Sequence, residues 1–184
     1  PRVRAPWPRR LHARVQQQQL SAASRGVVHR ARVVAHQHLP AGPLQGSVTM
    51  ATGSTLRPSI VGPVTVFAPI ATSGSVTIGA PTIANGAQTF NEFILNGAIS
   101  GTANVTFVNT TNTNQIFTVT LAAPGTYSGT TTIDNTAGTA GQMFVKLGVN
   151  NALPTTTVLN ILGQAGTGSG RGIGLNLFGF NQTL

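Results

Sequence analysis

The sequence predicts an all-β protein, and three observations favour a solenoid of stacked coils. From about residue 60 onward, short runs rich in Val, Ile, Thr and Phe recur every 11 to 17 residues, separated by Gly, Asn, Ser and Pro. Within these runs apolar residues alternate with polar ones, as in half-buried strands, and no window carries apolar residues at sustained helical spacing. The turns between the runs are rich in Asn and Thr and almost free of charge.

These features leave two architectures open, a solenoid and a β-sandwich or barrel. A sandwich or barrel also gives short strands at even spacing with turn signals between them. In a solenoid, like polar side chains pair from coil to coil, whereas stacked like charges would repel. The scarcity of charge therefore favours the solenoid, with the β-sandwich as the alternative. The expected strands begin near Val64, Val76, Phe90, Val105, Ile116, Thr130, Met143, Thr157 and Gly174.

The N-terminal part of the chain differs in composition from the rest. Eight of the 11 Lys and Arg residues lie at or before Arg32, and all four His residues lie at or before His38. The first threonine is Thr49. This part has too few apolar residues in periodic array to offset the entropy lost on ordering. We therefore expect residues 1–45 to form a disordered basic arm, either a solvated tail or not native coding sequence, and residues 60–184 to form the solenoid.

The basic arm raises the question of nucleic acid, metal and membrane partners. An Arg-rich, acid-poor arm is typical of a nucleic-acid patch or a transit peptide, but Trp7 is its only aromatic residue for stacking. We expect no nucleic-acid partner. A flexible arm could hold a metal only weakly, and the chain has no cysteine, so we expect no metal site. The sequence contains no run of 18 or more apolar residues, so we also expect no membrane-spanning helix. The only side chains of the arm that could act as metal ligands of this kind are the four histidines, His12, His29, His36 and His38.

The stretch TGSGRGIG, residues 167–174, resembles a dinucleotide-binding loop. Such a loop must follow a buried strand and open a long helix. Only ten residues follow Gly174, and their apolar residues alternate as in a strand. We therefore interpret the stretch as a turn and expect no cofactor.

The residues that could carry catalysis are few. Glu92 and Asp134 are the only acids, so a cluster of catalytic carboxylates cannot form from this chain alone. No histidine lies after residue 38 to activate a serine or threonine. We expect Tyr127, the single tyrosine, to have a packing role, with its hydroxyl in water or on backbone. The sequence thus predicts no enzyme and no catalytic, cofactor-binding or metal-binding residues.

Two stretches in the second half of the chain resemble a known repeat. They read APGTYSGTTTIDNT, residues 123–136, and LGVNNALPTTTVLNI, residues 147–161. Together they resemble the autotransporter-associated β-strand repeat of bacterial surface proteins. The resemblance covers about residues 94–184, including a lead-in segment, and departs from the family in two longer insertions around residues 134–148 and 163–174. The matching motifs are residues 126–129, 131–133, 151–154 and 179–183.

This resemblance implies a right-handed parallel β-helix whose repeats are structural and carry no known catalytic residues. The function it implies is that of a structural segment of a secreted or bacterial cell-surface, outer-membrane protein. Its partners would be neighbouring repeats of the same longer chain and, in an adhesive role, surface glycans or host surfaces. Two alternatives stay open: a fragment of a carbohydrate-active β-helix enzyme whose catalytic residues lie elsewhere, and a basic-tailed nucleic-acid-binding protein.

Overall fold

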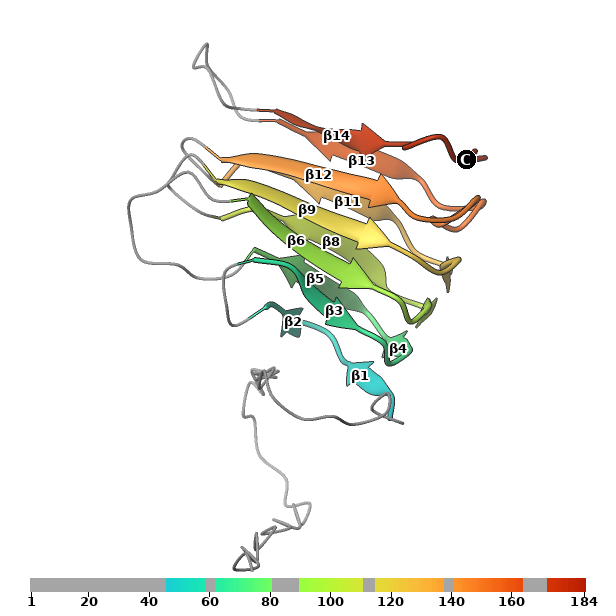
Figure 1. The fold of residues 1–184 in the computed structure, drawn as a ribbon. Helices are drawn as coiled ribbons and strands as arrows, with labels where there is room; N and C mark the ends of the chain where they lie inside the picture. The colour runs from blue at the N-terminus through green and yellow to red at the C-terminus, as the bar shows by residue number, and fades with distance from the viewer. Residues whose placement is uncertain (1–45, 59–61, 81–89, 111–114, 138–140, 164–171) are drawn as a thin grey trace, which may run out of the picture.

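The protein is a β-solenoid with three parallel sheets, seen in a computed structural model that describes residues 46–58, 62–80, 90–110, 115–137, 141–163 and 172–184 (Figure 1). Sheet A contains β1 (Val48–Met50), β4 (Ile70–Thr72), β7 (Ile99–Gly101) and β10 (Thr126–Tyr127). Sheet B contains β2 (Thr55–Leu56), β5 (Ser75–Gly79), β8 (Asn104–Val108), β11 (Thr131–Asp134) and β13 (Leu159–Leu162). Sheet C contains β3 (Val64–Val66), β6 (Phe90–Leu95), β9 (Ile116–Leu121), β12 (Gln142–Leu147) and β14 (Ile173–Asn176).

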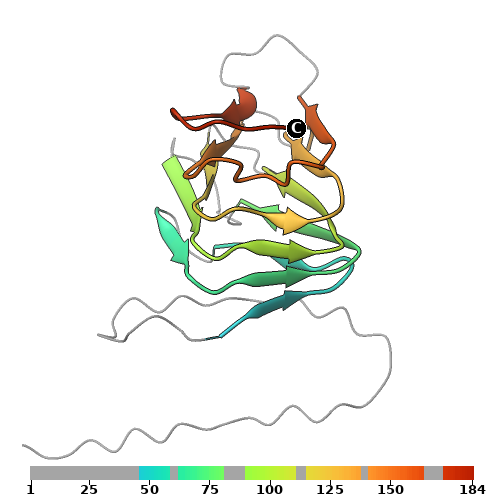
Figure 2. The ribbon, with the colours of Figure 1, turned by 90° about the vertical axis from the view of Figure 1, so that its right-hand side faces the viewer.

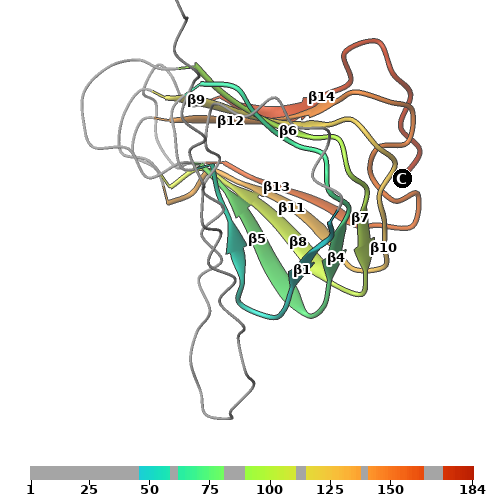
Figure 3. The same cartoon turned by 60° about the horizontal axis from the view of Figure 1, so that its bottom comes forward.

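Each of the first four coils contributes one strand to each sheet, in the order A, B, C. The strands β13 and β14 form a fifth coil on sheets B and C. Coils rise from β1 to β14 and wind right-handed, as crossovers between parallel strands do (Figure 1). Sheet C faces sheet B, and sheet A joins them along one side (Figure 3). Every pairing between described strands is parallel, which confirms the predicted β-helix and excludes the β-sandwich.

Hydrogen bonds between coils hold a fixed register. Phe93, Val119 and Val145 pair in turn in sheet C, each 26 residues after the last (93, 119, 145). The strands of sheet A also stack in register, with offsets that differ from coil to coil, and short turns lie between them and sheet B (Figure 2). Residues one coil apart therefore form rows that run along the solenoid axis.

The core consists of rows of apolar side chains that point inward. In the long strands of the second to fourth coils, such as β6, β11 and β12, every second residue is buried, because successive side chains of a strand point to opposite faces. Burial of one large side chain is worth about 1.5–3 kcal/mol, so these rows supply most of the stability. The two longest inward rows are Leu56, Ile78, Phe107, Ile133 and Ile161 in sheet B, and Val64, Phe93, Val119, Val145 and Leu175 in sheet C.

The outer face of sheet B carries the polar stacking expected from the sequence. Thr55, Thr77, Thr106 and Thr132 follow one another in register, and Asn160 continues the row. Neutral hydroxyl side chains in such a row tolerate close contact with their own kind, which charged side chains do not.

The structure contains strands that the sequence did not predict. All nine expected strands are present, with starts within two residues of those predicted. The unpredicted ones are β1, β2, β4, β7 and β10, which are only two or three residues long, too short to show alternation. Because β1 and β2 lie upstream of residue 60, the solenoid includes residues from Val48 onward, twelve residues before the expected boundary. The arm, residues 1–45, lies outside the described residues.

The last coil exposes apolar side chains that the earlier coils bury. Ile161 continues the row of Leu56 and Ile133, yet it is 46 % exposed, whereas both of those are buried. Among the described residues, β13 pairs only with β11 and β14 only with β12.

We therefore predict that the backbone amides of β13 and β14 exchange with deuterium faster than those of β11 and β12. Strands that pair on one side only open more readily than strands that pair on both. Hydrogen–deuterium exchange followed by mass spectrometry, at a concentration where light scattering shows a monomer, measures this. Equal protection of β11 and β13 would contradict it and would mean that another layer covers this end.

Candidate functional site

The tyrosine singled out from the sequence lies in the core. Tyr127 is the last residue of β10 and is 1 % exposed. Its hydroxyl lies 2.6 Å from Thr131 Oγ1, which lies 2.8 Å from Thr157 Oγ1. Thr157 donates to the carbonyl of Gly129 at 2.8 Å. Since that carbonyl can only accept, Thr157 accepts from Thr131, and Thr131 accepts from Tyr127.

This chain of hydroxyls corrects the expectation for the tyrosine hydroxyl, which bonds a side chain rather than water or backbone. The physical reason is the row to which Thr131 belongs. It occupies the inward position held by Val76 and Val105 in the preceding coils, so a hydroxyl there needs partners inside the core. Burial raises the pKa of Tyr127 to about 12, although the hydrogen bond with Thr131 acts in the opposite direction.

We predict that Thr157→Val destabilises the protein more than Tyr127→Phe does. The first change leaves the Thr131 donor and the Gly129 carbonyl without partners, at a cost of roughly 1–3 kcal/mol. The second removes one donor and leaves the rest of the chain intact, at roughly 0.5–1.5 kcal/mol. Urea unfolding measures both, with Thr132→Val on the outer face of the same sheet as the control. A larger loss for Tyr127→Phe would mean that the deduced donor direction is wrong.

We also predict a loss of stability at alkaline pH that depends on Tyr127. Its folded pKa of about 12 lies above the ordinary value of about 10 for an unfolded tyrosine. The stabilisation is therefore complete below about pH 10 and is lost as the pH rises towards 12, amounting to roughly 2–3 kcal/mol. Because the chain has one tyrosine, tyrosinate absorbance reports this residue alone. The free energy of unfolding of Tyr127→Phe should not show this loss at alkaline pH. An equal loss of stability with pH in the unmodified protein and in the variant would contradict the prediction.

The two acids of the sequence are not brought together. Glu92 lies on β6 in sheet C, and Asp134 ends β11 in sheet B. Asp134 accepts hydrogen bonds from the amide and hydroxyl of Thr136, both at 2.7 Å, in a local turn. Glu92 instead contacts residues of two later coils.

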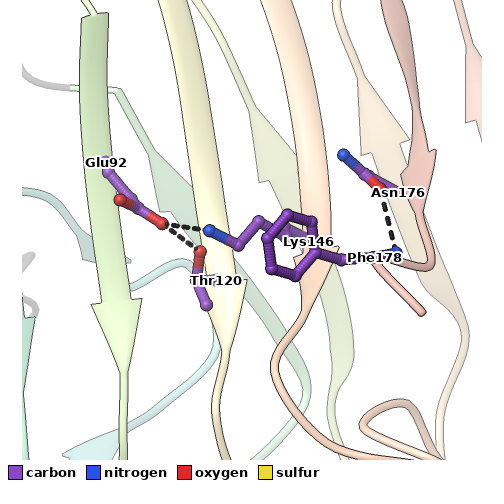
Figure 4. Close-up of polar contacts among 5 residues, drawn as sticks. All are labelled: Glu92, Thr120, Lys146, Asn176 and Phe178. Carbon is purple, nitrogen blue, oxygen red and sulfur yellow. Dashed lines mark hydrogen bonds and ion pairs between the residues drawn. The ribbon is translucent and has the colours of Figure 1, made fainter. Parts of the chain in front are cut away.

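Glu92 forms an ion pair across three coils (Figure 4). Its Oε1 accepts from Thr120 Oγ1 at 2.6 Å and from Lys146 Nζ at 2.9 Å. The Glu92 and Lys146 side chains are 35 % and 25 % exposed. The hydrogen bond from Thr120 lowers the pKa of Glu92, as do the hydrogen bond and charge of Lys146, while partial burial raises it; the net direction is down. Glu92 therefore stays ionised at pH values below those at which a glutamate usually becomes protonated.

The far side of Lys146 is covered by an aromatic ring. Lys146 Nζ lies 4.7 Å from the centroid of Phe178, a cation–π distance (Figure 4). Phe178 has a φ of 47°, which is uncommon for a bulky residue. The amide of Phe178 donates to Asn176 Oδ1 at 3.0 Å, and this Asx turn holds the unusual backbone conformation.

Glu92, Lys146 and Asn176 border a hollow of about 380 Å³ on the outer face of sheet C. We call it the sheet C groove. It crosses four strands, from β6 to β14, so every coil from the second to the fifth contributes to it. Its lining combines aromatic and aliphatic side chains with the ion pair and an amide. The lining includes Phe90, Glu92, Ile116, Phe144, Lys146 and Asn176.

The remaining sequence candidates can be placed only in part. Of the glycine-rich stretch, residues 167–171 lie outside the described residues, and Gly172 leads directly into strand β14, where a dinucleotide loop would open a helix. The four histidines also lie outside them. The described ranges contain no group of three or more metal-ligating side chains, and no helix long and apolar enough to span a membrane.

Two of the motifs that resemble the autotransporter repeat contact one another. Gln182 Oε1 accepts from the amide of Leu153 at 3.0 Å, and Gln182 Nε2 donates to the carbonyl of Leu153 at 3.1 Å. Thr183 donates its amide to Asn151 Oδ1 at 3.0 Å, and Asn151 donates its own to the carbonyl of Asn181 at 2.8 Å. Residues 151–154 and 179–183 therefore stack as parts of successive coils.

No family model, no curated protein and no solved structure matches the chain. The resemblance to the autotransporter repeat thus depends on the sequence motifs.

Sequence reasoning missed the sheet C groove. Phe144 was not singled out, Phe90 was named only as the start of an expected strand, and Glu92 was considered only as a catalytic partner of Asp134. One signal could have pointed to the groove. Lys146 and Glu92 are two of the few charges outside the arm, and they are 54 residues apart, close to two coils of the 26-residue register.

Proposed function

We propose that this chain is a structural β-solenoid segment of a secreted or cell-surface protein of the autotransporter type. In a solenoid each coil contacts only its neighbours, so the fold lengthens by adding coils and gives a rigid rod. The observation that supports this role most is the contact between residues 151–154 and 179–183, because two motifs shared with the repeat here join successive coils. The partners are then neighbouring repeats of a longer chain.

The proposed role is not enzymatic. Support comes from the separation of Glu92 and Asp134 on different sheets and from the ion pair that occupies Glu92. Hydrolysis of a glycosidic bond needs two carboxyl groups on either side of one bond. An adhesive role is supported by the sheet C groove, which opens on the outer face and leaves aromatic rings in contact with solvent.

We predict that the protein is accessible on the surface of intact cells of its source, or in their culture medium. An antibody raised against residues 46–184 should label cells without permeabilisation, and protease treatment of intact cells should remove the label. An antibody against a cytoplasmic protein is the control. Labelling that appears only after permeabilisation, with none in the medium, would overturn the proposed location.

A further inference from the structure

The sheet C groove has the composition of a small-ligand site. Its volume, about 380 Å³, lies in the range of about 300–1,000 Å³ typical of such sites. Sites of this kind have mostly apolar walls with a few polar groups that orient the ligand. The apolar and polar parts of this groove both come from outward positions of the same sheet.

The apolar part consists of outward side chains on three neighbouring strands. Phe90 on β6 is 72 % exposed, although a phenylalanine on a solvated strand face gains nothing from exposure. Ile116 on β9 pairs in register with Phe90, and Phe144 on β12 lies one strand further. The groove thus has two aromatic rings with an aliphatic side chain between their strands.

The polar part offers both donors and acceptors. Both hydrogen bonds to Glu92 end on Oε1, and no described residue donates to its Oε2. The amide of Asn176 uses Oδ1 for the turn at Phe178, and its Nδ2 has no described partner. The hydroxyl of Thr118 is also without one, and Lys146 has donors beyond the one given to Glu92. An acceptor and several donors therefore remain for a ligand.

Gly174 leaves one outward position of this face without a side chain. It continues the outward row of Glu92, Thr118 and Phe144. A Cβ built there meets no atom within 4 Å, so no neighbouring atom in the protein requires glycine at this position. Glycine inside a strand costs stability and marks a bulge, a bend, or a place where a ligand or another backbone approaches closely; here it leaves room for a ligand beside Phe144.

We propose that the sheet C groove binds a neutral saccharide ring. A sugar ring presents a C–H face that packs on aromatic rings, and hydroxyl groups that both donate and accept. Because Glu92 and Lys146 neutralise one another, the groove selects for hydroxyls rather than for net charge. The proposal deepens the adhesive part of the proposed function and depends on it for its biological setting.

The test measures binding of neutral oligosaccharides to the full chain. The probes are linear tetrasaccharides of glucose and of N-acetylglucosamine, with β-1,4 and α-1,4 linkages, followed by calorimetry and ligand-observed NMR. Neutral probes exclude attraction by the basic arm. We expect saturable binding of at least one probe that persists at high salt.

The variants locate the binding in the groove. Phe144→Ala and Phe90→Ala should each weaken binding about tenfold or more, as loss of one aromatic contact predicts. Glu92→Gln should weaken it, and Gly174→Leu should abolish it by filling the face. Phe67→Ala and Asp134→Asn are the matched controls, an exposed phenylalanine and the other acid outside the groove, and should leave binding unchanged. Circular dichroism verifies that each variant is folded.

Three results would overturn the proposal. These are no binding of any probe, binding that the groove variants leave unchanged, and stronger binding of aromatic peptides than of saccharides at the groove. Because binding is measured on purified protein, its failure is distinct from that of the surface-labelling experiment. If intact cells are labelled but the purified protein binds no saccharide, the structural role stands and the proposed saccharide site is wrong.

Discussion

The constraint on which this structure depends is parallel pairing of each coil with the next in a fixed register. It places residues one coil apart in the same row, so each side chain must be compatible with the side chains directly above and below it. Inward rows satisfy this with apolar residues, from Leu56 through Ile133 in sheet B. One polar residue in these rows, Thr131, is accommodated because Tyr127 donates to it and Thr157 accepts from it, so that all three hydroxyls have partners.

The same constraint accounts for the single ion pair recorded among the described residues. Like charges in one row would repel one another at the strand spacing of about 4.8 Å. Here Glu92 and Lys146 lie on β6 and β12, with β9 between them, and Thr120 on β9 donates to the same carboxylate oxygen that Lys146 contacts. Opposite charges in direct contact, with a hydroxyl that donates to the same carboxylate, suit a stacked surface, where a row of equal charges would not. The groove is the space that these unlike outward side chains leave between them.

The sequence predicted the long strands well, because six residues of alternation, as in Gln142–Leu147, are unambiguous. It could not predict sheet A, whose strands have two or three residues and no period to detect. It also could not predict the groove. That would require knowing which residues share a row, and the register shifts by 29 residues from Val64 to Phe93 but by 26 from Phe93 to Val119. Without those offsets, Glu92 and Lys146 are only two distant charges.

Sheet A also shows how the solenoid continues where a strand is missing. The fifth coil has no strand there among the described residues, and residues 151–154 take its place. Gln182 bonds both the amide and the carbonyl of Leu153, so its side-chain amide makes the two hydrogen bonds that a neighbouring strand would supply. Asn151, with a φ of 50°, can adopt the left-handed conformation at low cost and accepts from Thr183 as well. Side-chain amides therefore supplement the backbone hydrogen bonds, such as that from Asn151 to Asn181, at a corner that has no strand. In this structure, the motif residues Asn-Ala-Leu-Pro and Gly-Phe-Asn-Gln-Thr serve to join one coil to the next.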